Sequence, residues 1–301
     1  MGLVFDIGGT KTRAGVFDPA RLELIGSLTA ATPNHLDFPA SSFEQLRDQL
    51  LSLLQRLGNQ LADPRSLDRI DVAFAGPIDR SGNVLAAPTV WGTRMRGPYD
   101  LGEEIARRWP RARVTIMNDL TAAGYRYLRP DGADFCVVTV SSGIGNKVFI
   151  GGRPMIGPNA RGGELGHLRV DDSPAAPACE CGGRGHLEGI LGYRAMRLRF
   201  LDMEPEEIFL EARQGDTRTC EFVKLWHRAL AAATASSIHF DGPGRFYLAG
   251  PNSDFVDILE SVGQVEVPAF PIKRRFIGAL MLQALRAAIG GPRRRAAPHR
   301  P

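Results

Sequence analysis

The sequence predicts an α/β protein built from two similar halves. A glycine-rich turn occurs twice, as DIGGTKT at residues 6–12 and as SSGIGNK at residues 141–147. Each turn stands between two short apolar runs that are typical of strands. Segments with strand and helix periodicity alternate along the chain, which is characteristic of an α/β sheet. The second glycine-rich hairpin restarts this pattern and therefore indicates a duplicated architecture.

The first half is predicted to open with a β-hairpin and to continue with two β-α cycles. An amphipathic helix is expected at residues 42–57, because one phenylalanine and five leucines recur there at near-helical spacing. The other predicted elements of this half are strands at 3–5, 13–17, 70–74 and 114–117, and helices at 101–109 and 120–128. In the second half we expect strands at 135–140, 148–150 and 246–249, and helices at 222–237 and 276–289.

Length and composition are those of a globular protein. The chain has 301 residues, of which 44% are hydrophobic and 23% charged, enough for a sizeable core and two domains. We expect the domains at residues 1–130 and 131–290, followed by a disordered tail at 291–301. Much of the net charge of +4 lies in this Pro/Arg-rich tail, so a nucleic-acid partner is not expected.

The expected location is the cytoplasm. No apolar run approaches the roughly 20 residues of a membrane span, so no membrane association is expected. A secretory signal peptide is not expected either, because Asp6 follows Met1 too closely for one.

Both glycine-rich turns are predicted to bind phosphate. Glycine allows the backbone N–H groups of a hairpin tip to approach an anion closely, and hydroxyl side chains add further donors. A Walker P-loop would run from a strand into a helix through a Gly-Lys-Ser/Thr ending, which this sequence lacks. The pattern therefore favours a hairpin-type clamp in which two tips hold a polyphosphate.

Asn118 and Asp119 form a second candidate site, where a predicted strand meets the next helix. Ligands of α/β sheets bind at the carboxyl ends of strands. A carboxylate there can accept a proton from an alcohol, and the neighbouring amide can hold an adjacent hydroxyl. Asn and Asp are also preferred helix N-caps, so position alone leaves a purely structural role open.

A third group contains four residues that can ligate a metal. His167, Cys179, Cys181 and His186 offer two imidazoles and two thiolates, a set that suits a tetrahedral structural zinc. The loop between them is rich in proline and glycine and has little apolar material to determine its shape, so a bound metal would stabilise it. The alternative is four unconnected residues. A disulfide between Cys179 and Cys181 is not expected in a reducing cytoplasm.

Together the motifs resemble the ROK family of sugar kinases and repressors, within the actin-like ATPase superfamily. The resemblance is carried in order by residues 6–12, by Asn118-Asp119, by GELGH at 163–167 and by CECGGRGHLE at 179–188. It implies two actin-like (ribonuclease H-like) lobes around a central cleft, and a homodimer. It also implies an ATP-dependent kinase that transfers the γ-phosphoryl group to a hydroxyl of a hexose or a sugar-like cyclitol, with Asp119 as the catalytic base.

The resemblance further implies residues that bind the nucleotide. Asp6 is expected to act through the magnesium ion of the nucleotide. The first phosphate loop is matched by Gly8, Gly9, Thr10 and Thr12. The second loop is matched by Ser142, Gly143 and Gly145, and Gly250 falls where a glycine pair usually meets adenosine.

The remaining roles implied by the resemblance concern the acceptor and the zinc. The positions that hold sugar hydroxyls are matched by Asn118, Glu164, His167 and Glu188. The segments of the first lobe that line the sugar pocket are matched by Gly76, Pro77 and Thr89. Zinc would be bound by His167, Cys179, Cys181 and His186.

The chain departs from the family pattern at three places. His186 stands where the family usually has a third zinc cysteine, and Pro251 where glycine is typical of the adenosine segment. Asn146 and Lys147 stand where the second phosphate loop usually continues with glycine. Lys147 could place a cation beside the phosphates or face solvent.

Glucose is the usual acceptor in the family, and the departures make a specialised C7-cyclitol or N-acetylhexosamine kinase the alternative. Another alternative is a regulator that binds sugar without phosphorylating it. Such regulators carry a helix-turn-helix domain ahead of the first phosphate loop, and a loop that begins at Asp6 is expected to leave no space for one. A non-catalytic actin-like binding module is the third alternative.

Overall fold

The computed structural model describes residues 1–249, except 19, 22, 142, 158–161, 180 and 242–244, together with a short strand at 265–266. The chain divides into two compact units, the first running from Met1 to Arg126 and the second beginning at Tyr127. This division lies close to the boundary at residue 130 that the sequence predicts. The predicted helix at 276–289 and the tail at 291–301 lie outside the described residues.

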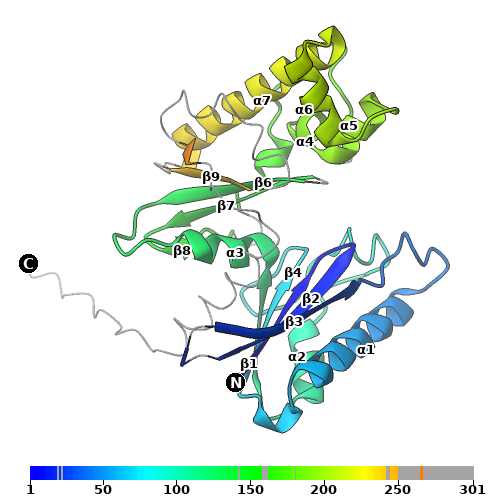
Figure 1. The fold of residues 1–301 in the computed structure, drawn as a ribbon, viewed down its shortest axis with the longest axis vertical. Coiled ribbons are helices and arrows are strands. Elements are labelled where there is room, and N and C mark those ends of the chain that lie inside the picture. The colour runs from blue at the N-terminus through cyan, green and yellow to red at the C-terminus, as the bar shows by residue number, and fades with distance from the viewer. Residues whose placement is uncertain are drawn as a thin grey trace, which may run out of the picture. The chain divides into compact units, whose positions relative to one another are not determined.

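The first unit is a mixed β-sheet with helices packed against it (Figure 1). Its strand order is β3-β2-β1-β4-β5, in which β1, β2 and β3 are antiparallel neighbours and β4 runs parallel to both β1 and β5. The elements are β1 (Gly2–Ile7), β2 (Lys11–Asp18), β3 (Glu23–Ala31), α1 (Phe43–Leu61), β4 (Arg69–Phe74), α2 (Leu101–Arg108), β5 (Arg113–Asn118) and α3 (Asp119–Gly124).

The elements predicted for this half are present, and β3 is an addition. Strand β3 escaped prediction because its side chains are exposed or only half-buried, so it lacks a clear apolar face. The helix expected at 120–128 begins one residue earlier and gives way to a 3₁₀ turn after Gly124. Helix α1 begins where Ser42 and Gln45 cap each other in a capping box.

The core of the first unit follows the two-residue alternation of its central strand. Leu3 and Phe5 of β1 pack into one cluster with the leucines of α1, whereas Val4 belongs to a second cluster with Ala122 of α3. Gly58 of α1 allows the close approach of this helix to the sheet, because a Cβ there would lie 3.0 Å from the Leu3 side chain. Helices on both faces therefore bury the sheet.

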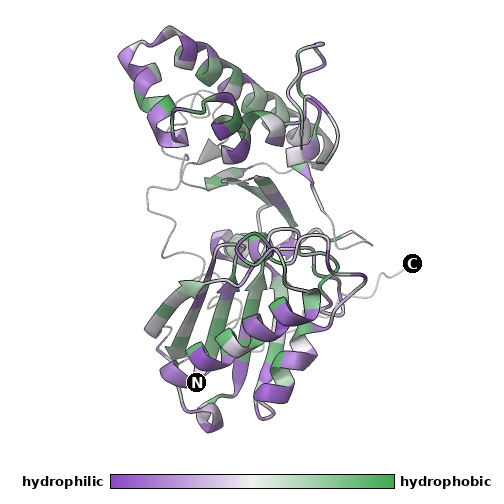
Figure 2. Cartoon of the chain, turned by 90° about the vertical axis from the view of Figure 1, so that its right-hand side faces the viewer, coloured by the Kyte–Doolittle hydropathy of each residue, from purple (hydrophilic) through white to green (hydrophobic). Residues whose placement is uncertain are grey.

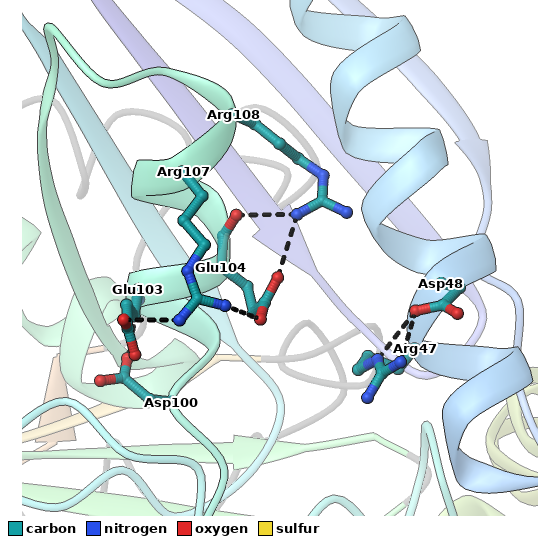
Figure 3. A network of polar contacts seen from close by, with 7 residues as sticks. All are labelled: Arg47, Asp48, Asp100, Glu103, Glu104, Arg107 and Arg108. Atoms are coloured by element: carbon teal, nitrogen blue, oxygen red, sulfur yellow. Dashed lines mark hydrogen bonds and ion pairs between the residues drawn. The ribbon is translucent and has the colours of Figure 1, made fainter.

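Helix α2 carries a network of ion pairs on its exposed side (Figure 3). Arg107 bonds to Glu103 at 2.7 Å and to Glu104 at 2.6 Å, and Arg108 reaches Glu104 at 3.2 Å. Exposed pairs of this kind contribute little to stability, because water and salt screen them. The position of α2 is therefore determined mainly by its buried face, formed by Leu101 and Ile105.

The second unit repeats the topology of the first. Its strand order is β10-β9-β6-β7-β8, with an antiparallel hairpin β6-β7 and parallel pairing of β6 with β9 and of β9 with β10. The order of β6 to β10 thus matches that of β1 to β5, as the repeated hairpin predicts. The strands are β6 (Phe135–Val140), β7 (Ile144–Ile150), β8 (Arg153–Pro154), β9 (Phe246–Ala249) and β10 (Val265–Glu266).

Four helices supply the core of the second unit, namely α4 (Glu188–Leu191), α5 (Tyr193–Arg199), α6 (Pro205–Gln214) and α7 (Thr217–Asp241). Trp226 of α7 is fully buried in a cluster that includes Val138 of β6. Figure 2 shows the helices striped, with hydrophobic residues on one side and hydrophilic residues on the other. Helices α4 to α6 escaped prediction because they are short, at 4, 7 and 10 residues. Within the described residues, no helix combines the length and hydropathy needed to cross a membrane.

Candidate active site

In the first unit, strand register brings three predicted site segments to one edge of the sheet. Ile7 pairs with Phe74, and Phe74 pairs with Asn118, so these residues form one row across β1, β4 and β5. Each strand ends at this row. Because the three strands are parallel, the segments that follow them begin at the same edge. These segments carry the first hairpin tip, Gly76 and Asp119.

Asn118 is a helix cap and at the same time a support for Asp119. Its Oδ1 accepts the N–H groups of Leu120 at 3.0 Å and of Thr121 at 3.1 Å, which caps α3. Its Nδ2 donates to the Gly76 carbonyl at 3.1 Å and to Asp119 Oδ1 at 2.8 Å. The capping alternative left open by the sequence is therefore correct for Asn118, and the same amide orients the neighbouring carboxylate.

One oxygen of Asp119 is held and the other is available. Oδ1 accepts from Asn118 and from the Leu120 N–H, both at 2.8 Å. Among the described residues, no hydrogen bond reaches Oδ2. Burial raises the pKa of Asp119 to about 7, and the charge of nearby Asp6 adds to the increase, against the opposing hydrogen bonds from Leu120 and Asn118. A carboxylate with this pKa can accept a proton near neutral pH.

The first hairpin tip connects β1 and β2 as predicted, and it exposes backbone and one hydroxyl. The Gly8 N–H is bonded across the tip to the Lys11 carbonyl at 3.0 Å. Thr10 is exposed, whereas Thr12 is buried in β2 and shares a 2.8 Å hydrogen bond with the Thr32 hydroxyl. Of the two threonines assigned to this phosphate loop, Thr10 therefore presents the exposed hydroxyl.

Thr89 lies against the same tip. A Cβ at Gly9 would lie 2.8 Å from the Thr89 carbonyl and from its Cβ, so glycine is required for this approach. Gly76 has a similar constraint, because a Cβ there would overlap the Ala86 carbonyl. The carbonyl of Pro77 accepts the Leu85 N–H at 2.9 Å. The loop between β4 and α2 is thereby held beside the tip and the end of β4.

Arg13 is a functional candidate that sequence reasoning missed. Its Nη1 lies 2.7 Å from Asp6 Oδ2, and the Asp6 side chain is almost fully buried. Burial raises the pKa of Asp6, while the charge and the hydrogen bond of Arg13 oppose that increase. Asp6 and Arg13 are direct partners across the hairpin. Counting the register outward from the tip would have identified this pair.

In the second unit, Glu188 lies against the second hairpin tip. Glu188 Oε2 accepts the Ile144 N–H at 3.0 Å, and a Cβ at Gly143 would lie 2.5 Å from the same oxygen. The tip is closed by a hydrogen bond from the Ser141 N–H to the Gly143 carbonyl at 2.9 Å. Gly145 continues into β7 opposite Thr139. A predicted acceptor-binding carboxylate and the predicted phosphate tip are thus in direct contact.

The side chains of Asn146 and Lys147, both in β7, are buried in the second unit. Their exposure is 6% and 5%, so the expectation that Lys147 might face solvent is wrong. Asn146 Oδ1 accepts the Leu165 N–H at 2.8 Å, and Lys147 Nζ lies 3.5 Å from the Gly162 carbonyl. Both side chains therefore reach the loop that carries Glu164. Glycine at these two positions would leave the space between β7 and this loop unfilled.

Glu164 precedes a 3₁₀ turn, η3 (Leu165–His167), and His167 is the last residue of that turn. Both side chains are exposed. Gly166, between them, packs closely on β7, since a Cβ there would lie 2.5 Å from the Ile144 carbonyl. The turn and the second hairpin therefore form one packed unit.

The four predicted metal ligands come together. The ligand atoms of His167, Cys179, Cys181 and His186 all lie within 4.8 Å of one another. A tetrahedral zinc with these donors separates its ligand atoms by about 3.3–3.8 Å, so the cluster can close on the ion with small side-chain movements. The pairs Cys179 Sγ with His167 Nδ1 and Cys181 Sγ with His186 Nδ1 are 3.8 and 3.1 Å apart. The alternative of four unconnected residues is wrong.

The metal loop accommodates His186 in place of the usual cysteine. A Cβ at Gly183 would overlap the imidazole of His186, so a glycine at that position makes space for the larger ligand. Backbone hydrogen bonds from Cys179 to Gly183 and from Gly182 to Cys179, at 2.9 and 3.0 Å, shape the intervening turn. The donor set and the local backbone therefore fit a bound zinc.

The motifs that carry these contacts match a known family along almost the whole chain. The model of the ROK family matches residues 3–269 of the 301. The chain belongs to the ROK family. Its predicted membership, stated from the ordered motifs, is confirmed.

Two relatives and one solved structure illustrate the range of proteins to which this chain is similar. A C(7)-cyclitol 7-kinase of Streptomyces hygroscopicus subsp. jinggangensis is 37% identical over 195 residues, which cover 64% of this chain and 55% of the kinase. An N-acetylmannosamine kinase of Escherichia coli is 31% identical over 240 residues, 77% of each chain. A ROK hexokinase from Thermus thermophilus superposes with a TM-score of 0.71 at 25% identity, covering 96% of this chain and 99% of the hexokinase.

Three ROK positions singled out in the sequence lie outside the described residues. They are Ser142 of the second tip, and Gly250 and Pro251 of the adenosine segment. Ala249, which precedes this segment, ends β9 and pairs with Thr139 of β6. The last residue of β9 thus lies beside the hairpin whose tip carries Gly143.

Proposed function

We propose that this ROK protein is an ATP-dependent kinase that transfers the γ-phosphoryl group to a hydroxyl of a sugar or a sugar-like cyclitol. The observation that carries the proposal is Asp119. It lies at the carboxyl end of β5 with Oδ1 held, Oδ2 available and a pKa of about 7. The related ROK proteins named as kinases support the same reaction class.

Asp119 acts as the general base of the transfer. Its Oδ2 accepts the proton of the acceptor hydroxyl as the oxygen attacks phosphorus, a role typically worth about 10²- to 10⁴-fold in rate. Asn118 keeps the carboxylate in one orientation through its 2.8 Å hydrogen bond. Because both amide hydrogens of Asn118 are already donated, to Gly76 and to Asp119, a hydroxyl of the acceptor would have to replace one of these partners.

Each glycine-rich tip is a phosphate-binding element of its own unit. The exposed Thr10 and the backbone of Gly9 supply donors in the first unit, and Gly143 and Gly145 contribute backbone in the second. Magnesium, when bound with the nucleotide, neutralises charge on the phosphates. Asp6 fits a role toward that ion, because Arg13 engages only its Oδ2 and Oδ1 makes no hydrogen bond within the described residues.

The acceptor is held by residues of the second unit. Glu164 and Glu188 accept hydrogen bonds from ring hydroxyls, and His167 contributes a polar contact from the other side of η3. In the first unit, Gly76, Pro77 and Thr89 are the residues assigned to acceptor binding. Zinc bound by His167, Cys179, Cys181 and His186 stabilises the loop that leads to Glu188. A homodimer remains a prediction from the family.

The reaction is tested by measuring ATP consumption and product mass across hexoses, N-acetylhexosamines and C7-cyclitols. We expect acceptor-dependent ADP formation and one added phosphate per acceptor molecule. The greater identity to the cyclitol kinase leads us to expect turnover of a C7-cyclitol, and preference for glucose or N-acetylmannosamine would reassign the acceptor within the same reaction. Acceptor binding without turnover, in protein that binds ATP, would contradict the kinase and favour a sugar-binding regulator.

The rate should depend on pH through Asp119. The base must be ionised, so kcat/KM is expected to rise about tenfold per pH unit below pH 7 and to level off above it, given a pKa of about 7. The profile is measured from pH 5.5 to 8.5 at saturating Mg-ATP, with near-UV circular dichroism at each pH as the control for folding. A flat profile across this range would assign the proton acceptance to another group.

A further inference from the structure

Glu164 occupies an unusual backbone conformation. With φ at 53° and ψ at 35° it is left-handed, and in the described part of the chain it is the only residue other than glycine with positive φ. Such a conformation is unfavourable for a residue with a side chain, so the surrounding contacts must maintain it. Glu164 also stands at the N-cap position of η3, yet its side chain makes no capping hydrogen bond.

Asn146 supplies the cap that Glu164 does not. From β7, its Oδ1 accepts the Leu165 N–H at 2.8 Å, and its Nδ2 points to Cys136 Sγ at 3.8 Å. Gly163 has a φ of 99° and lacks a side chain where a Cβ would overlap the Asn146 amide. The two residues on either side of Glu164 are therefore both held by Asn146, one through a hydrogen bond and one through close contact.

The Glu164 carboxylate is not used to cap the turn. A glutamate at an N-cap position can turn back and accept the N–H groups of its own helix, which would occupy its oxygens. Here no such bond forms: the Leu165 N–H is bonded to Asn146, the His167 N–H is bonded to the Glu164 backbone carbonyl at 2.9 Å, and within the described residues the exposed Glu164 side chain makes no hydrogen bond or ion pair. The carboxylate is thus left available for a ligand.

We propose that Asn146 is a positioning residue that holds Glu164 in its left-handed conformation and keeps the carboxylate directed at the acceptor substrate. The inference rests on the proposed function in one respect, the contact between Glu164 and the acceptor. Lys147, which follows Asn146 and reaches the Gly162 carbonyl, restrains the same loop from its other end. Glycine at both positions would provide neither contact.

Three variants separate this role from general destabilisation. Asn146→Ala removes the bond to Leu165 and is expected to raise the KM for the acceptor about three- to tenfold, with the KM for ATP changed less than twofold. Asn146→Asp retains an oxygen that can accept the Leu165 N–H and should restore the acceptor KM to within about threefold of the wild type. Cys136→Ala removes the other partner of Asn146 from the buried core and should leave both KM values unchanged.

A second measurement does not depend on turnover. Hydrogen exchange of the Leu165 amide, followed by NMR, should be slow in the wild type and in Asn146→Asp and about tenfold faster in Asn146→Ala. Unchanged exchange in Asn146→Ala, an unchanged acceptor KM, or equal increases of both KM values would overturn the inference. If the wild type phosphorylates no acceptor, the proposed function fails and the substrate role of Glu164 with it, while the exchange rates still decide whether Asn146 holds the turn.

Discussion

Asp119→Asn is expected to abolish phosphoryl transfer while the protein stays folded and continues to bind its acceptor. The substituted amide retains an oxygen that can accept from Asn118 and Leu120, the two donors that hold Oδ1 at 2.8 Å. It cannot accept a proton at neutral pH, so kcat should fall at least about 10²- to 10⁴-fold. Turnover and calorimetric acceptor binding are measured on the same preparation. Turnover retained near the wild-type rate would reject Asp119 as the base.

The same variant should be more stable than the wild type at alkaline pH. The pKa of Asp119 is raised from 3.8 to about 7, so ionisation disfavours the folded state. The stability that comes from the protonated carboxyl is complete below about pH 4 and is lost as pH rises through 7. Thermal melting should therefore show Asp119→Asn gaining most over the wild type at pH 8 and little at pH 5.

Asp48→Asn is the matched control for this stability measurement. Asp48 lies in α1 of the same unit, its side chain is 63% exposed and it pairs with Arg47 (Figure 3). The substitution also removes one carboxylate, but it should change neither kcat nor the pH dependence of melting beyond a small screened effect. A loss of stability in Asp119→Asn at every pH would instead indicate a structural role for the carboxylate.

Removal of zinc is the second change with a large expected effect. Purified protein should contain about one zinc per chain, because the four donors lie in one group and suit a single tetrahedral ion. Chelation or Cys179→Ser should unfold the loop and abolish turnover. His167 and His186 lie three and two residues from Glu164 and Glu188, so loss of the metal would release both segments that are proposed to bind the acceptor. Metal analysis, melting temperature and turnover are measured together.

Two further variants sharpen the zinc experiment. Cys220→Ser is the control for loss of a thiol, because Cys220 lies on α7 outside the metal cluster and donates to the Ala212 carbonyl at 3.1 Å. It should retain zinc and activity. His186→Cys restores the usual ligand of the family and should also retain zinc. Full activity in metal-free protein would contradict a structural zinc.

Much of this protein was determined by local signals in its sequence. The spacing of leucines in α1, the apolar runs of the strands and the two glycine-rich tips each depend on neighbouring residues, and these predicted the α/β class and the duplicated topology. The place of Asp119 at a strand end and the grouping of the four metal ligands were likewise readable, because strand ends and short ligand spacings are local features.

The partners of the buried polar groups were decided by tertiary structure. Thr12 bonds to Thr32 across 20 residues, Leu165 to Asn146 across 19, and Ile144 to Glu188 across 44. Sequence spacing does not specify such pairs, because they depend on strand register and on which loops pack against which strands. For the same physical reason only the fold showed that Asn118 supports Asp119 as well as capping α3, and that Asn146 holds the turn beside Glu164.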